Sequence, residues 1–160
     1  LLKLERHSST ARGLTLLFAD MDGLKTINDT CGHEAGSEAI QAIARVMKSV
    51  VRSGDIVARW GGDEFVILTV GTDADTADQM IKRIYERLDE HNAFSGKPYK
   101  VACSIGLANL RSDGSRSFED MIAEADKAMY TEKKRRKAGR SREGRTSDGE
   151  NDLPDSLAWY

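Results

Sequence analysis

Two apolar runs along the chain have the length and composition of buried strands. The first, Leu14 to Phe18, is partly β-branched or aromatic, follows Gly13 and has acidic Asp20 at its C-terminal edge. The second is Val101 to Leu107. Short apolar runs bounded by turn-forming residues are typical of strands inside a sheet. We therefore expect two buried strands, the first of which ends beside a carboxylate.

A third pattern predicts a β-hairpin. Ile56 to Ala58 and Phe65 to Leu68 are apolar, and Trp60-Gly61-Gly62-Asp63 stands between them. Paired glycines permit positive φ at a tight turn. The turn therefore carries the carboxylates of Asp63 and Glu64.

Elsewhere the apolar positions recur at i, i+3, i+4 and i+7, which predicts amphipathic helices, with a break at Gly36 before the first of them. Three helical stripes are formed by Ile40, Ile43, Ala44, Met47, Val50 and Val51, by Ala77, Met80, Ile81, Ile84, Tyr85 and Leu88, and by Phe118, Met121, Ile122, Ala125 and Met129. The order β, α, α, β, β, α, β, α predicts an α+β fold with a central, mostly antiparallel sheet and helices packed against it. From Ala138 the chain is polar and Gly-rich, so we expect a domain at 1–137 and a flexible tail at 138–160.

Composition narrows the classes of function. The chain has 160 residues, which suits one domain with its own core. Its net charge of -2 argues against a protein that wraps nucleic acid or binds an anionic membrane. No apolar run approaches the roughly 20 residues that span a bilayer, and the first residues lack the sustained apolar region of a signal peptide. We expect a cytoplasmic protein, to which a sensory domain is joined in a longer chain.

Two acidic segments are candidates for chemistry: Asp20-Met21-Asp22 after the first strand and Asp63-Glu64 in the hairpin. If the two strands are neighbours, Asp20 and Asp63 meet and form an oxygen-rich site that suits Mg²⁺ or Mn²⁺. The alternative is that these residues are ordinary solvated acids in turns.

Phosphate could be bound in two places. The run from Asp20 to Lys25 leads from a strand into a helix start, where backbone N–H groups and the helix dipole favour phosphate. The basic run Lys133 to Lys137 closes the last helix and could also reach a phosphate, although cations are favourable at any helix C-terminus. No P-loop motif is present, which argues against a P-loop nucleotidase.

Five segments together resemble the signature of the GGDEF-domain diguanylate cyclases, in family order between about residues 14 and 137. They are Asp20-Met21-Asp22-Gly23-Leu24-Lys25-Thr26-Ile27-Asn28-Asp29, Gly32-His33-Glu34-Ala35-Gly36, Arg59-Trp60-Gly61-Gly62-Asp63-Glu64-Phe65, Ser104-Ile105-Gly106 and Ala125-Asp126-Lys127-Ala128-Met129-Tyr130. The resemblance implies a ferredoxin-like sheet similar to the adenylyl cyclase core and the polymerase palm. It also implies an enzyme that joins two nucleoside triphosphates into a 3′,3′-cyclic dinucleotide and releases pyrophosphate.

The resemblance further implies a role for each matching residue. The catalytic acids would be Asp20, Asp63 and Glu64, and two Mg²⁺ or Mn²⁺ ions per active site would be held by Asp20, the Met21 carbonyl, Asp63 and Glu64. The phosphates would be bound by Gly23, Leu24, Lys25, Gly61, Gly62, Lys133 and Lys137. The metal would activate the 3′-hydroxyl and neutralise charge on the reacting phosphates. Because each subunit would hold one nucleotide, turnover would need a homodimer with two facing sites.

Asn28 and Ser37 occupy the positions where the family reads the base. The family usually has aspartate where this chain has Ser37, and a carboxylate accepts both N–H groups of the guanine edge. A serine hydroxyl can donate or accept, so it tolerates adenine as well. We therefore expect both GTP and ATP as substrates, and cyclic GMP-AMP beside cyclic di-GMP, as in the hybrid, promiscuous branch of the family. The alternative is a strict diguanylate cyclase in which Ser37 is a neutral substitution.

Arg52 and Asp55 match the family's product-inhibition site, and Arg83 matches a third contributor on the following helix. An arginine can grip guanine or phosphate and an aspartate can accept from guanine N–H groups, although the pair could also simply end a helix and form a turn. A bound cyclic dinucleotide would hold the catalytic faces apart. A non-catalytic receptor is the competing function, and the intact signature argues against it. The Asp-x-Leu-Thr-x-Leu-x-Asn-Arg stretch that usually precedes this region is absent, which we interpret as truncation.

Overall fold

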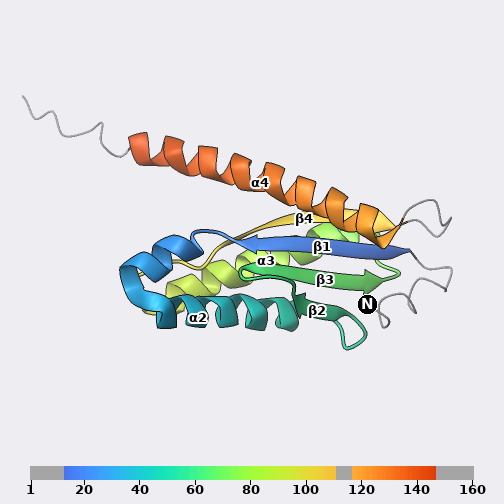
Figure 1. The fold of residues 1–160 in the computed structure, drawn as a ribbon, viewed down its shortest axis with the longest axis horizontal. Coiled ribbons are helices and arrows are strands. Elements are labelled where there is room, and N and C mark those ends of the chain that lie inside the picture. Colours follow the sequence, from blue (N-terminus) through green and yellow to red (C-terminus); the bar gives the residue numbers. More distant parts are fainter. Residues whose placement is uncertain (1–12, 111–116, 147–160) are drawn as a thin grey trace, which may run out of the picture.

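A four-stranded antiparallel sheet forms the centre of the molecule (Figure 1). The computed structural model describes residues 13–110 and 117–146. The strands are β1 (Leu14–Met21), β2 (Ile56–Arg59), β3 (Glu64–Val70) and β4 (Cys103–Leu110), and they lie in the order β2-β3-β1-β4. Each neighbouring pair is antiparallel, which confirms the α+β fold with an antiparallel sheet.

Helices cover both faces of the sheet. They are α2 (Leu24–Val50), α3 (Ala74–Phe94) and α4 (Phe118–Thr146). Figure 1 shows α4 on one side of the strands, with α2 and α3 on the other. No helix among residues 13–110 and 117–146 is long and apolar enough to cross a membrane.

Strand β1 is buried on both faces, which explains its continuous apolar sequence. Successive side chains of a strand point to opposite faces of the sheet. Leu17 and Ala19 accordingly pack in the core beneath α2 and α3, whereas Leu16 and Phe18 pack beneath α4. Like β3, β1 also pairs with a strand on each of its edges, so it is enclosed on all sides.

Helix α4 lies very close to the sheet at Gly106 of β4. A Cβ atom at this position would lie 2.0 Å from the carbonyl oxygen of Ala125 and 2.2 Å from the nitrogen of Met129, both on α4. Only a residue without a side chain allows the helix to lie this near the strand. The glycine therefore sets the distance between α4 and the sheet.

Three details differ from the sequence predictions. The helical break lies at Gly32, where φ is 87° and ψ is 163°, and Gly36 lies inside the helix. Neither Gly61 nor Gly62 has positive φ. The turn needs the missing side chain at Gly61, where a Cβ atom would clash with Glu64, whereas a Cβ atom at Gly62 would meet nothing within 4 Å. Helix α4 continues to Thr146, past the boundary expected after residue 137, while residues 147–160 lie outside the described part of the chain.

Candidate active site

The sheet brings the two acidic segments together. Asp20, near the end of β1, stands opposite Glu64 of β3 in the register of the sheet. One residue further, the Met21 N–H donates to the Asp63 carbonyl over 2.9 Å. The neighbouring strands that the metal-site hypothesis required are therefore present.

The Asp20 carboxylate is largely enclosed and accepts a hydrogen bond from the ammonium group of Lys133 on α4. Its side chain is 15% exposed. Burial raises the pKa of Asp20, the hydrogen bond and charge of Lys133 oppose this, and the charges of Asp63 and Asp22 raise it further. The net pKa lies above the ordinary value, chiefly because burial disfavours the charged form of the carboxylate.

Lys133 is the basic residue that the structure brings into this site. Burial lowers its pKa, but the hydrogen bond from its ammonium group to Asp20 and the charges of Asp20, Asp22 and Asp63 raise it more, so the net pKa is above the ordinary value. One ammonium group thus faces several carboxylates. Lys137 lies one helical turn further along α4 and is exposed.

The donor chemistry of this position fits a divalent cation. Asp20, the Met21 carbonyl, Asp63 and Glu64 offer oxygen atoms, which Mg²⁺ and Mn²⁺ prefer, and the local charge is negative. Among residues 13–110 and 117–146, no three His, Cys, Asp or Glu side chains are already arranged as a metal cluster. In the structure Lys133 supplies the positive charge at Asp20.

The hairpin turn owes its shape to Arg59 and to the absence of a side chain at Gly61. A Cβ atom at Gly61 would lie 2.3 Å from Oε2 of Glu64, so the Glu64 side chain occupies that space. The Arg59 Nε donates to the carbonyl oxygens of Gly61 and Gly62, each over 3.1 Å. Arg59 was not among the predicted site residues, although its place directly before the turn was the available signal. The Gly62 carbonyl is thereby engaged by arginine.

The connection from β1 to α2 leaves backbone donors at a helix N-terminus. Gly23, the N-cap residue, has φ 74° and makes no side-chain capping hydrogen bond. Asp22 is fixed beside it, because its N–H donates to the Ala102 carbonyl over 2.8 Å and its carboxylate accepts from the Ser104 hydroxyl over 3.0 Å. The first-turn amides, including those of Leu24 and Lys25, suit an anion such as phosphate.

A pocket of about 520 Å³ connects the first turns of α2 to the hairpin turn. Its lining includes both base-reading candidates, Asn28 and Ser37, together with Asp63. A Cβ atom at Gly36 would lie 1.9 Å from Oδ1 of Asn28, so the glycine leaves room for that carboxamide. The other lining residues are Leu24, Lys25, Asp29, His33, Gly36, Ile40, Arg59 and Gly62. The structure thus brings both predicted base-reading residues, three predicted phosphate contacts and Asp63 to one hollow. Its lining does not include Asp20, Glu64 or Lys133.

The predicted inhibition residues lie at the opposite end of β2 from the hairpin turn. The Arg52 N–H donates to a carboxylate oxygen of Asp55, and the Asp55 N–H donates to the Arg52 carbonyl, each over 3.0 Å. These bonds form a turn at the start of β2, and the Arg52 side chain is exposed. Arg83 is exposed on α3, where its Nε donates to the Gln79 carbonyl over 3.4 Å.

Comparison with known proteins gives concordant matches. The model of the diguanylate cyclase GGDEF domain matches residues 2–139. The chain is similar to the probable diguanylate cyclase DgcC of Escherichia coli strain K12, with 37% identity over 137 residues, which are 86% of this chain and 35% of that protein. The chain therefore spans about a third of the length of that relative.

Two solved structures have a similar fold. One is the active GGEEF domain of a diguanylate cyclase from Vibrio cholerae, with a TM-score of 0.74, 28% identity and coverage of 84% of this chain and 85% of that chain. The other is the GGDEF domain of DgcB from Caulobacter crescentus in complex with c-di-GMP, with a TM-score of 0.71, 25% identity and coverage of 82% and 81%.

Proposed function

Because this chain belongs to the GGDEF family of diguanylate cyclases, we propose that it condenses two GTP molecules into cyclic di-GMP and releases pyrophosphate. The observation that carries the proposal is the single pocket in which Asp63 meets Asn28, Ser37 and the first turn of α2. A cytoplasmic location, where GTP is available, is part of the proposal.

GGDEF cyclases use divalent metal ions. Asp20, the Met21 carbonyl, Asp63 and Glu64 would hold Mg²⁺ or Mn²⁺, two per site in our proposal, and bound metal supplies Lewis-acid stabilisation of charge on the reacting phosphates. The N-terminal amides of α2 and the Lys133 ammonium would bind the β- and γ-phosphates. Lys137, Gly61 and Gly62 stay predicted phosphate contacts.

The reaction that we propose consists of two like steps. In each, a 3′-hydroxyl oxygen of one nucleotide attacks the α-phosphorus of the other, the bond to pyrophosphate breaks, and the hydroxyl proton is lost to a base or water. Glu64, whose carboxylate lies against Gly61, is the residue that we propose to polarise this hydroxyl. With one nucleotide per subunit, two copies of the chain must face each other, which makes the encounter of the nucleotides a positioned one.

A finer proposal concerns the base. Ser37 lines the pocket beside Asn28, and its hydroxyl can both donate and accept, so ATP is expected to bind as well as GTP. The products would then include cyclic GMP-AMP. A strict diguanylate cyclase would instead read guanine without Ser37.

The experiment is a product assay with equimolar ATP and GTP and Mg²⁺, resolved by chromatography and mass. We expect cyclic di-GMP together with cyclic GMP-AMP, and Ser37→Asp should remove the adenine-containing product while cyclic di-GMP is kept. An unchanged product ratio in that variant would mean that Ser37 does not select the base. Cyclic di-GMP alone from the unchanged chain would favour the strict cyclase.

The catalytic assignment has a matched control. Asp63→Asn removes one charge from the pocket and should abolish turnover with the fold retained, whereas Asp78→Asn removes one charge from the exposed side of α3 and should change nothing. A folded, fully active Asp63→Asn variant would overturn the metal assignment.

Feedback by the product is the remaining proposal. Arg52, Asp55 and Arg83 would bind a cyclic dinucleotide on a surface away from the pocket, since β2, four residues long, separates the two by roughly 13 Å. Arg52→Ala should raise the product concentration needed for inhibition and leave the initial rate unchanged. Product binding without any turnover in the unchanged chain would favour the non-catalytic receptor.

A further inference from the structure

Helix α4, which carries Lys133, contacts the rest of the molecule at a place beyond its apolar face. On α4 the buried residues Met121, Ala125 and Met129 pack under the helix at intervals of four. Lys133 is the next position in this series, and it contacts Asp20 instead of the apolar core. The stretch of α4 around Lys133 therefore needs another anchor to keep its ammonium group at the acidic site.

Arg136, almost one helical turn after Lys133, provides such an anchor. Its guanidinium carbon lies 4.4 Å from the centre of the Tyr85 ring, within the range of a cation–π contact. The Nε atom of Arg136 is buried and has no hydrogen-bond partner in the described part of the chain. Burial raises the pKa of Tyr85 to about 12, so the ring beneath the cation is a neutral phenol. Contact with the ring face, rather than a hydrogen bond from Nε, holds the arginine.

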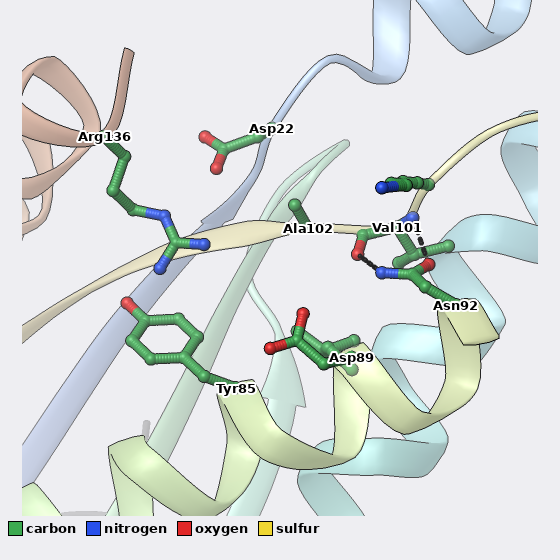
Figure 2. A pocket seen from close by; sticks show the side chains of 9 residues that line it. Asp22, Tyr85, Asp89, Asn92, Val101, Ala102 and Arg136 are labelled. Carbon is green, nitrogen blue, oxygen red and sulfur yellow. Dashed lines mark hydrogen bonds between the residues drawn. The ribbon is translucent and has the colours of Figure 1, made fainter. Parts of the chain in front are cut away.

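The contact connects the two helical layers. Tyr85 belongs to α3, which covers one face of the sheet, and Arg136 belongs to α4, which covers the other. Figure 2 shows the two side chains meeting beside β4, the edge strand, with the Asp22 carboxylate on the same side as the guanidinium group. All three residues line one pocket of about 500 Å³, and Asp22 stands two residues after Asp20. The anchor and the acidic site are therefore adjacent.

We propose that Arg136, stacked on Tyr85, is a positioning residue that holds Lys133 at the triphosphate-binding site. Arg136 acts through Lys133 and does not itself touch the nucleotide. The proposal rests on the proposed nucleotide-binding function of the same site. The proposal adds one requirement for triphosphate binding that lies outside both acidic segments, namely an aromatic ring on α3.

The test measures equilibrium binding of a non-hydrolysable GTP analogue with Mg²⁺ by the full chain, so it needs no turnover. Arg136→Ala and Tyr85→Leu should each weaken binding about threefold to tenfold, the range that a partly desolvated cation–π contact supports. Tyr85→Phe keeps the ring and Arg136→Lys keeps a cation, so both should restore most of the affinity. The matched control is Tyr130→Leu, which removes an exposed ring of α4 that Lys134 covers, also at 4.4 Å, and should leave affinity unchanged.

A double-mutant comparison separates positioning from general stabilisation. If Arg136 acts through Lys133, Arg136→Ala should add little to the loss already caused by Lys133→Ala. Full additivity of the two losses, or equal losses for Tyr85→Phe and Tyr85→Leu, would overturn the proposal. If the unchanged chain binds the analogue but forms no cyclic dinucleotide, the proposed function fails while the positioning role stands. If the chain does not bind the analogue at all, both fail.

Discussion

Replacing Gly106 with alanine tests how strictly the position of α4 is set. The new Cβ would lie 2.0 Å from the Ala125 carbonyl oxygen and 2.2 Å from the Met129 nitrogen. Ordinary contact begins at 3.4 Å, so the first separation must grow by about 1.4 Å. Both obstructing atoms belong to the backbone of α4, so no side chain can rotate away and the helix itself must move.

The cost of that movement can be bounded. Added carbon in a packed core costs about 1–3 kcal/mol, and we expect the upper end here because the clash is with backbone on α4. With a urea m-value of about 2 kcal/mol/M, a loss of about 3 kcal/mol lowers the denaturation midpoint by about 1.5 M. A shift of α4 by about 1.4 Å also moves Lys133 relative to Asp20, so GTP binding should weaken together with stability.

Urea denaturation followed by circular dichroism measures the first effect, and titration with a GTP analogue measures the second. Gly139→Ala is the matched control, since Gly139 is also on α4 and a Cβ atom there meets nothing within 4 Å. That variant should gain up to about 1 kcal/mol from helix propensity. The reasoning is refuted if Gly106→Ala and Gly139→Ala have the same midpoint.

Further predictions concern the thiols, the hairpin turn and the end of α3. Cys31 is exposed, whereas Cys103 is buried and its burial raises its pKa to about 12. A thiol reagent at pH 8 should therefore modify one cysteine in the native protein and two in urea. Fast reaction of both cysteines in the native protein would contradict the burial of β4. Arg59→Ala removes the donor to the carbonyls of Gly61 and Gly62 and should lower turnover at least about tenfold, with little change in melting temperature. The control variant Arg87→Ala on α3 should leave turnover unchanged. The Asn92 side chain donates to the Val101 carbonyl over 2.8 Å and accepts from the Val101 N–H over 2.7 Å. Asn92→Ala should therefore lower the free energy of unfolding, measured by urea denaturation, by about 2–3 kcal/mol. A loss below about 0.5 kcal/mol would mean that water replaces these bonds.

The apolar runs predicted the strands well because burial on both faces leaves a direct trace in the sequence. Leu14 to Phe18 is such a run, and the structure confirms its strand and the family's fold. The sequence predicted the meeting of Asp20 with the hairpin acids only on the condition that the two strands are neighbours, and the pairing of β1 with β3 meets that condition.

Contacts between distant residues were not predictable in this way. Nothing local in the sequence indicates that Arg136 lies on Tyr85, because the contact depends on how α4 passes the edge of the sheet. The role of Gly61 was assigned to positive φ from general turn chemistry, whereas the structure shows that the Glu64 side chain needs the space. We expected the helical break at Gly36, whereas the structure has it at Gly32. Both glycines interrupt the apolar pattern, and only the backbone angles distinguish them.

The central position of β1 has a consequence for the motions of the molecule. Its backbone is paired with β3 on one edge and β4 on the other, and helices cover both of its faces. Amide protons in such a strand exchange with solvent only when the whole domain opens, so those of β1 should be among the slowest in a hydrogen-exchange experiment. Asp20 is then attached to the part of the protein that opens least often, and small fluctuations of the surface loops leave its place unchanged.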